Sequence, residues 1–217
     1  MTYEEQIMLE YKAFRRGAFN EVVKTLMSLV LLAAVSVFLY FLCLPEPTPT
    51  AELMAQNPSK YLEVICEQQG NNNCWLMAAS AAASYRADLR KDTADVLEYV
   101  NSKHRVKEAG GDSTHEALVY EFYELESTSG SEKLTVKEVV SIVDEGYPIY
   151  CVIATKDFKL AHAVIICGYE LDGDNVSYFI MDPMTTFISA IEVDQKTNMF
   201  KFKSNDVLYT NWVRYRY

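Results

Sequence analysis

Residues 22–44 form an apolar run that sets the organisation of the whole chain. The run VVKTLMSLVLLAAVSVFLYFLCL carries one charge, at Lys24. It then continues for about twenty apolar or small residues, the length that a helix needs to span a bilayer. The run is longer than the apolar part of a cleaved signal peptide. We therefore expect a transmembrane helix over 22–44, retained as a signal-anchor.

Basic residues near the two ends of this run predict its orientation. Four of them lie at or before its N-terminal edge, and the first one after it is Lys60. Basic residues next to a span stay on the cytoplasmic side of the membrane. We expect residues 1–21 to be a cytoplasmic N-terminal segment, and the part of the chain after the span to lie outside the cell membrane.

The rest of the chain divides into a linker and one domain. The sequence PEPTPT is typical of a stiff, polyproline-like spacer, and we place a proline-rich linker over 45–56. Residues 57–217 are enough for a single folded domain of ordinary size. Half of the chain is hydrophobic, which indicates a globular protein and not a disordered one.

The chain has a net charge of −10, and all of it lies after residue 44. Residues 1–44 carry four basic and four acidic side chains, which cancel. An acidic domain surface repels the phosphates of nucleic acids and anionic lipids. We therefore expect no nucleic-acid partner.

The five cysteines and three histidines do not suggest a metal site. The cysteines lack the paired spacing of zinc ligands, so we expect no metal and no organic cofactor. Cys151 and Cys167 lie in apolar runs and are predicted to be core residues. His104 and His115 lie in polar helical stretches, and we expect both to face solvent.

Helical patterns precede strand patterns along residues 57–217. This order predicts an α+β fold with an antiparallel sheet in its second half. Helices are expected over 75–90, 92–104, 110–126 and 135–147. Strands are expected over 148–155, 162–171, 176–183, 187–193 and 207–217.

Capping residues mark where three of these helices begin. Asp92 or Thr93 is the expected N-cap of the second helix, and Ser113 or Thr114 that of the third. The fourth helix is predicted to begin with a capping box at Thr135.

Cys74 lies where the alanine-rich first helix is expected to begin. Unpaired backbone N–H groups and the helix dipole stabilise a negative charge at that position, which favours the nucleophilic thiolate. Gln68 precedes Cys74 by six residues. Its amide, together with the Cys74 backbone N–H, is placed to bind the oxyanion of a tetrahedral intermediate.

His162 and Asp182 supply the other groups that a cysteine nucleophile needs. His162 opens an apolar strand, and Asp182 ends the next one. If the two strands are neighbours, the carboxylate would fix the tautomer of the imidazole and favour its protonated form. Each residue alone has an ordinary structural explanation, so the hypothesis rests on their combination.

Three segments resemble the papain-like cysteine peptidase superfamily. QQGNNNCW is similar to its Gln-x5-Cys-Trp segment, HAVIICGY to its His-Ala-Val strand, and SYFIMDP to the strand that ends in the residue orienting the histidine. The similarity is greatest to compact bacterial branches, namely bacteriocin-leader-processing, staphopain-like and effector-type peptidases. The chain departs from plant and lysosomal members by having Asp182-Pro183 where they have Asn-Ser.

The resemblance implies a papain-like fold over 57–217 and hydrolysis of peptide bonds. It assigns Cys74 as nucleophile, His162 as general base and acid, Asp182 as orienting residue and Gln68 as oxyanion donor. The expected partners are a peptide or protein substrate, secreted or near the membrane, the membrane itself, and a membrane protein recruited through the span.

Two alternatives stay open on the sequence alone. A transglutaminase-like acyl transferase uses the same Cys, His and Asp order with the cysteine at a helix start. A papain-like domain without activity would instead serve as a binding subunit of a membrane complex.

Overall fold

A computed structural model describes Met27 and residues 58–67, 73–107 and 110–217. The linker, Gln68 and all of the predicted span except Met27 lie outside the described residues. Within the described ranges, no helix combines the length and the apolar character needed to cross a membrane.

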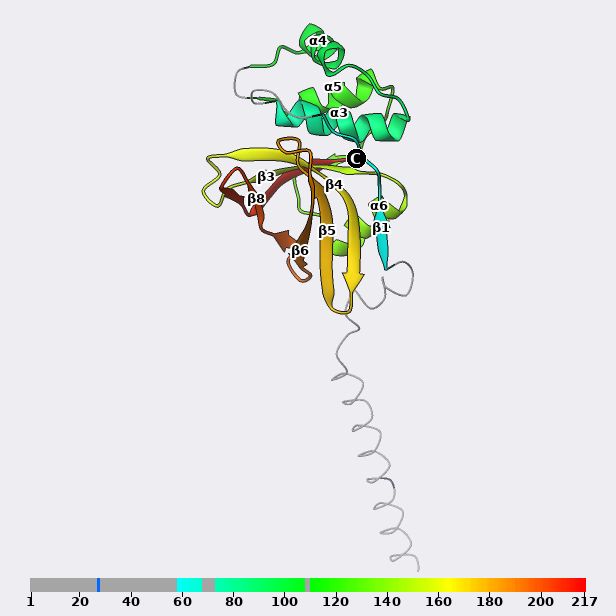
Figure 1. Ribbon diagram of the computed structural model, residues 1–217, viewed down its shortest axis with the longest axis vertical. Helices are drawn as coiled ribbons and strands as arrows, with labels where there is room; N and C mark the ends of the chain where they lie inside the picture. Colours follow the sequence, from blue (N-terminus) through cyan, green and yellow to red (C-terminus); the bar gives the residue numbers. More distant parts are fainter. Residues whose placement is uncertain (1–26, 28–57, 68–72, 108–109) are drawn as a thin grey trace, which may run out of the picture. The chain divides into compact units, whose positions relative to one another are not determined.

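Helices precede the main strands along the described chain, which confirms the predicted α+β fold. Figure 1 shows α3, α4 and α5 grouped on one side of the sheet, with α6 apart from them beside β1. The helices are α3 (Cys74–Ala87), α4 (Thr93–Lys103), α5 (Ser113–Phe122) and α6 (Val136–Asp144).

The sheet has eight strands, and all the pairs are antiparallel. Its order is β2-β10-β3-β4-β5-β6-β7, and β1 pairs with β4 where β3 has ended. A separate hairpin is formed by β8 and β9. The strands are β1 (Ser59–Tyr61), β2 (Ser129–Gly130), β3 (Ile149–Ala154), β4 (Ala161–Asp172), β5 (Asn175–Met181), β6 (Ile188–Asp194), β7 (Met199–Phe200), β8 (Phe202–Ser204), β9 (Val207–Tyr209) and β10 (Asn211–Arg216).

All five predicted strand segments form strands, and the last one divides at Thr210 into β9 and β10. The short strands β1, β2, β7 and β8 were not predicted. They have two or three residues each. Such lengths are too short for an alternating pattern to be recognised.

Helix α3 is the buried centre of the fold. Residues on all of its faces are buried, including Trp75, Leu76 and a run of alanines at 0–5% exposure. A helix that is apolar all round is stable only when it is surrounded by protein. Its small side chains let α5 and β4 approach closely, which fixes the position of the first residue of the helix, Cys74.

Of the three predicted helix N-caps, two are confirmed and one is wrong. Asp92 caps α4, and Thr135 forms the predicted capping box with Glu138 at the start of α6. The predicted cap of α5 was wrong, because the N-cap is Asp112. An aspartate carboxylate satisfies two first-turn N–H groups of this helix, which is stronger capping than a hydroxyl provides.

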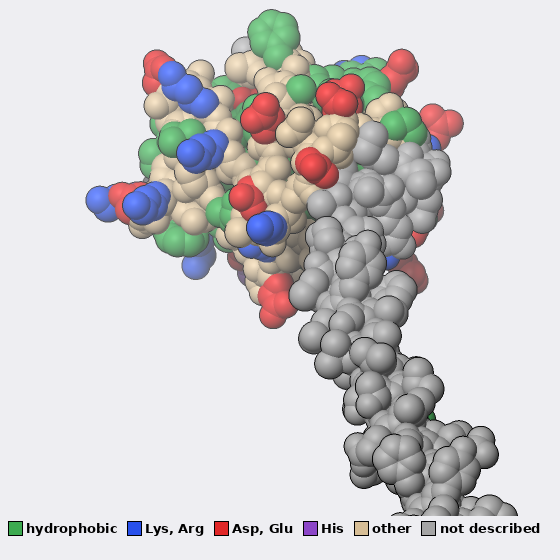
Figure 2. All heavy atoms as spheres, turned by 90° about the horizontal axis from the view of Figure 1, so that it is seen from below, with side chains coloured by type: hydrophobic (Ala, Val, Ile, Leu, Met, Phe, Trp, Pro, Cys, Tyr) green, Lys and Arg blue, Asp and Glu red, His purple; other side chains and the backbone are tan. Residues whose placement is uncertain are grey.

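Charged side chains of both signs are interspersed on the face that Figure 2 shows. Neither acidic nor basic groups gather into one patch among the described residues of this face. A continuous basic stripe of the kind that follows a nucleic-acid backbone is therefore absent there.

A buried ion pair joins the helices to the sheet beneath α3. Arg214 Nε on β10 donates to Glu116 Oε1 on α5 at 2.8 Å, and Tyr150 on β3 donates to the same oxygen at 2.7 Å. Arg214 also donates to the carbonyl of Gly111 at 3.2 Å. The Glu116 side chain is 1% exposed and that of Arg214 is 26% exposed, so removal of the carboxylate leaves the Tyr150 hydroxyl without this acceptor and Arg214 with the Gly111 carbonyl in place of an ion pair.

We predict that Glu116→Ala lowers the free energy of unfolding by about 3 kcal/mol, because it breaks a buried charge pair. Glu98→Ala is the matched control, since Glu98 is an exposed glutamate on the neighbouring helix α4. That change should stay within about 0.5 kcal/mol. Urea unfolding of both variants measures the difference, and equal effects would contradict the role given to the buried pair.

Candidate active site

Cys74 is the first residue of α3 and is partly buried. The N-cap Asn73 makes no capping hydrogen bond with its side chain. The N–H groups of the first turn are therefore not taken by a cap and remain available to a negative charge. Together with the helix dipole, they make this position favourable for a thiolate.

The surroundings of Cys74 stabilise the thiolate further. Burial raises the pKa of the thiol. The opposing effects are larger, so the pKa is lowered: they are the hydrogen bond and charge of His162 and backbone hydrogen bonds from Ala163 and Trp75. The other thiols described differ in this respect. Burial raises the pKa of Cys66 and Cys167 to about 12.

His162 and Asp182 come together because β4 and β5 are antiparallel neighbours. His162 is the second residue of β4, and Asp182 directly follows β5, so the start of one strand meets the end of the other. His162 Nε2 lies 2.7 Å from Asp182 Oδ1, and the two side chains are 3% and 5% exposed. The carboxylate accepts from Nε2, which leaves Nδ1 as the ring nitrogen for the Cys74 thiol.

The carboxylate of Asp182 stays ionised although it is buried. Burial raises its pKa, but hydrogen bonds from His162, Ser204 and the backbone of Met184 lower it below the ordinary value. An ionised carboxylate at this distance stabilises a positive charge on the imidazole.

His162 is correspondingly held in its protonated form. Burial lowers the pKa of the imidazole, but the hydrogen bonds to Asp182 and Cys74 and the charges of both groups raise it to about 9. The lowered thiol pKa and the raised imidazole pKa both favour the state in which Cys74 is a thiolate and His162 is an imidazolium.

The β8–β9 hairpin packs two aromatic rings against the histidine. Phe202 and Tyr209 are paired across the hairpin, and their ring centroids lie 6.5 Å and 5.5 Å from that of His162. Two residues beyond Phe202 on the hairpin, Ser204 Oγ donates to Asp182 Oδ2 at 2.6 Å. The hairpin therefore encloses the His162–Asp182 pair and excludes water from it.

The sequence reasoning missed these three hairpin residues. The segment FKSNDVLY alternates buried and exposed residues, and Asn205 and Asp206 both have left-handed backbone angles, with φ of 44° and 62°. Two such residues are typical of a tight hairpin turn, so the hairpin itself was predictable. Nothing in the segment indicates that Ser204 reaches Asp182.

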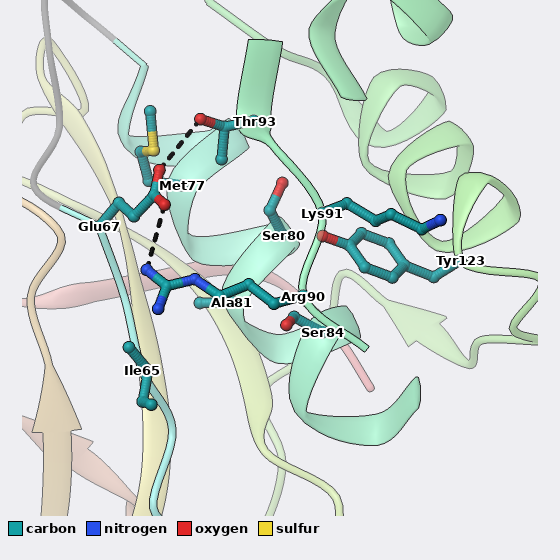
Figure 3. A pocket seen from close by; sticks show the side chains of 10 residues that line it. All are labelled: Ile65, Glu67, Met77, Ser80, Ala81, Ser84, Arg90, Lys91, Thr93 and Tyr123. Carbon is teal, nitrogen blue, oxygen red and sulfur yellow. Dashed lines mark hydrogen bonds and ion pairs between the residues drawn. The ribbon is translucent and has the colours of Figure 1, made fainter. Parts of the chain in front are cut away.

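The segment that leads to Gln68 is tied to the helices. Figure 3 shows the Glu67 carboxylate accepting hydrogen bonds from Arg90 and Thr93, at 3.1 Å and 3.2 Å. The Arg90 and Glu67 side chains are largely exposed, so this pair contributes little free energy but sets the direction of the chain. Gln68 itself lies outside the described residues, and its role as oxyanion donor stays a prediction.

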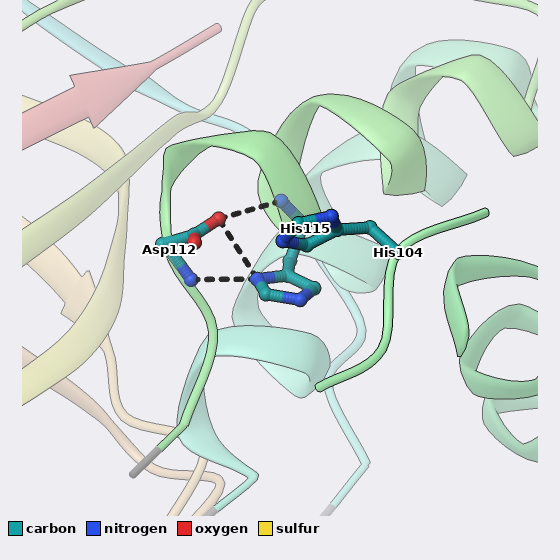
Figure 4. Close-up of side chains that lie close together, drawn as sticks. All are labelled: His104, Asp112 and His115. Atoms are coloured by element: carbon teal, nitrogen blue, oxygen red, sulfur yellow. Dashed lines mark hydrogen bonds and ion pairs between the residues drawn. The ribbon is translucent and has the colours of Figure 1, made fainter. Parts of the chain in front are cut away.

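A second cluster of polar side chains, His104, Asp112 and His115, lies at the start of α5 (Figure 4). Within the described part of the chain it is the one group close enough to share a metal ion. However, His115 Nδ1 accepts a hydrogen bond from the Asp112 N–H at 3.0 Å, which completes a capping box. Because this nitrogen is already used, we assign the cluster to helix capping.

The expectation that His115 faces solvent was wrong, whereas His104 is exposed as expected. His115 is 3% exposed, and its ring packs on Trp75 with centroids 5.7 Å apart. The capping box draws the side chain back over the helix start, where it is covered. Cys151 and Cys167 are fully buried, as predicted.

Comparison with known proteins places the chain in a family. Residues 61–215 match the Peptidase_C39 like family. The chain therefore belongs to this family and, with it, to the papain-like cysteine peptidase superfamily. A comparison with curated proteins gives no match.

Two solved structures are similar to the chain. One is a C39-like peptidase from Bacillus anthracis, with a TM-score of 0.47 and 14% sequence identity, covering 64% of this chain and 90% of that one. The other comes from a study of the mite allergens Blo t 1 and Der p 1, with a TM-score of 0.46 and 10% identity, covering 71% of this chain and 67% of that one.

We predict that iodoacetamide alkylates Cys74 faster than any of the buried thiols at neutral pH, because only Cys74 has a lowered pKa among the described cysteines. His162→Ala should slow this reaction about tenfold or more, since a thiol pKa higher by one unit leaves a tenth of the thiolate. Mass spectrometry of the modified peptides measures both rates, with Cys74→Ala as the blank. Equal labelling of several cysteines would count against the thiolate pair.

Proposed function

We propose that the chain is a membrane-anchored cysteine peptidase whose catalytic domain lies outside the cell membrane. Cys74 acts as nucleophile, His162 as general base and acid, Asp182 as orienting residue and Gln68 as oxyanion donor. The observation that carries the proposal is the buried hydrogen bond of 2.7 Å that holds the His162 ring beside the first residue of α3. The family assignment supports the same reaction class.

The reaction follows from the protonation states of the pair. The Cys74 thiolate attacks the peptide carbonyl carbon, and the Cys74 N–H and Gln68 bind the resulting oxyanion. His162 gives its Nδ1 proton to the departing amine as the carbon–nitrogen bond breaks and a thioester forms. Neutral His162 then takes a proton from water, which attacks the thioester and releases the acid and the thiolate.

We predict that hydrolysis of a mixed peptide library depends on pH on both sides of neutrality. On the acid side, kcat/KM should fall as the Cys74 thiolate is protonated, at a pH below the ordinary cysteine range. On the alkaline side, it should fall as His162 loses its proton, at a pH of about 9. Cleavage products identified by mass spectrometry measure the profile.

Cys74→Ala and His162→Ala are the variants that connect this profile to the proposed residues. Each should lower kcat/KM by at least about 10⁴-fold, because the groups act as a unit. A labelled primary amine in the same reaction separates hydrolysis from acyl transfer. Incorporation of the amine into peptide without cleavage would favour the transglutaminase-like alternative.

The location outside the membrane rests on the apolar run 22–44 and the basic residues before it. Such an anchor favours substrates that are secreted or lie near the membrane. The lipid-facing side chains of such an anchor would also form a surface that a membrane protein can bind.

We predict that an impermeant maleimide labels Thr48→Cys in intact protoplasts of a bacterial host, because the linker is outside. Thr2→Cys should be labelled only after the cells are lysed. Both variants are made in a Cys43→Ala, Cys74→Ala background, so that neither the thiol at the end of the span nor the reactive thiol contributes. Labelling of Thr2→Cys in intact protoplasts would show the opposite orientation.

A further inference from the structure

The buried carboxylate of Asp182 accepts three hydrogen bonds, and one of them comes from a distant hairpin. Oδ1 accepts from His162 Nε2 at 2.7 Å and from the Met184 N–H at 2.9 Å. Oδ2 accepts from Ser204 Oγ at 2.6 Å. Among the described residues, Ser204 is the one donor to Oδ2, and its side chain is itself buried at 5% exposure.

The hairpin does not need this hydroxyl for its own structure. Ser204 pairs with Val207 through the backbone, and the turn between them is formed by Asn205 and Asp206 in left-handed conformations. Its neighbours on the same face of the hairpin, Phe202 and Val207, are apolar. A lone hydroxyl on this apolar face is unfavourable unless it is hydrogen-bonded, and its partner is the Asp182 carboxylate.

We propose that Ser204 is a positioning residue of the active site, which holds the Asp182 carboxylate in the orientation that its hydrogen bond to His162 requires. The inference rests on the proposed function, because it assigns Ser204 a part in the same reaction. Ser204 touches neither substrate nor thiol, and it acts only through Asp182.

The effect passes along the hydrogen bonds in a defined order. Without Ser204, Oδ2 would be buried without a donor, which disfavours the ionised carboxylate and raises the Asp182 pKa. A carboxylate that has lost this hydrogen bond is also free to rotate away from Nε2, so it stabilises the imidazolium less. The His162 pKa then falls from about 9, and the thiolate pair gives way to the neutral thiol and imidazole.

The test is the His162 pKa in the full-length chain, measured by NMR with histidine labelled at Cε1. The chain has three histidines, so the His162 signal is identified by its loss in His162→Ala. Ser204→Ala should lower the His162 pKa by about one unit, the size expected for loss of one hydrogen bond to a charged group. The alkaline limb of kcat/KM should move to lower pH by the same amount.

Three further variants distinguish positioning from simple packing. Ser204→Thr keeps the hydroxyl and should keep the wild-type pKa. Ser204→Cys keeps the size of the side chain but donates weakly, so it should lower the pKa as Ser204→Ala does. Ser189→Ala, at an exposed serine on β6, should change nothing.

The outcomes separate this inference from the proposed function. An unchanged His162 pKa in folded Ser204→Ala overturns the inference, whether or not the chain cleaves peptides. Loss of the fold in both Ser204→Ala and Ser204→Cys also overturns it, because Ser204 would then serve the core. A shifted pKa in a chain without peptidase activity supports the positioning role and contradicts the proposed function.

Discussion

The hydrogen bond between His162 Nε2 and Asp182 Oδ1 is the interaction on which the account of this protein depends. It is short, it is buried, and it joins two strands whose other residues form the apolar core. A buried carboxylate or a buried imidazolium would be unfavourable alone. Together, the Asp182 carboxylate accepts the Nε2 proton of His162 and stabilises the positive charge of its ring. The remaining ring nitrogen is thereby directed to the start of α3.

The rest of the fold places two elements around this bond. Helix α3 brings Cys74 at its first turn, where the N-cap side chain makes no hydrogen bond, and its alanines let it lie close against β4. The β8–β9 hairpin brings Ser204 and two aromatic rings. The buried Glu116–Arg214 pair ties the helices to the sheet beneath them. Each contact is between elements far apart in the chain, so the site exists only when the whole domain is folded.

The sequence predicted the parts of this arrangement that depend on local patterns. The helix beginning near Cys74, the strand beginning near His162 and the strand ending near Asp182 follow from composition, periodicity and turn residues. The contact of Ser204 with Asp182 was not predictable, because a serine beside an Asn-Asp turn is ordinary in any hairpin. His115 was predicted to be exposed because the pattern around it is polar, whereas Asp112 caps the helix and draws the ring inward. Local patterns place elements, but contacts across the fold decide which polar residues are buried.

The central claim is that Cys74 is a thiolate beside an imidazolium before any substrate binds. The most direct measurement is the ultraviolet absorbance of the thiolate, titrated with acid and recorded as the difference between wild type and Cys74→Ala. The Cys74 thiolate is expected to persist below the ordinary cysteine pKa, and His162→Ala is expected to abolish this persistence. A Cys74 thiol that titrates in the ordinary cysteine range, unaffected by His162→Ala, would contradict the account.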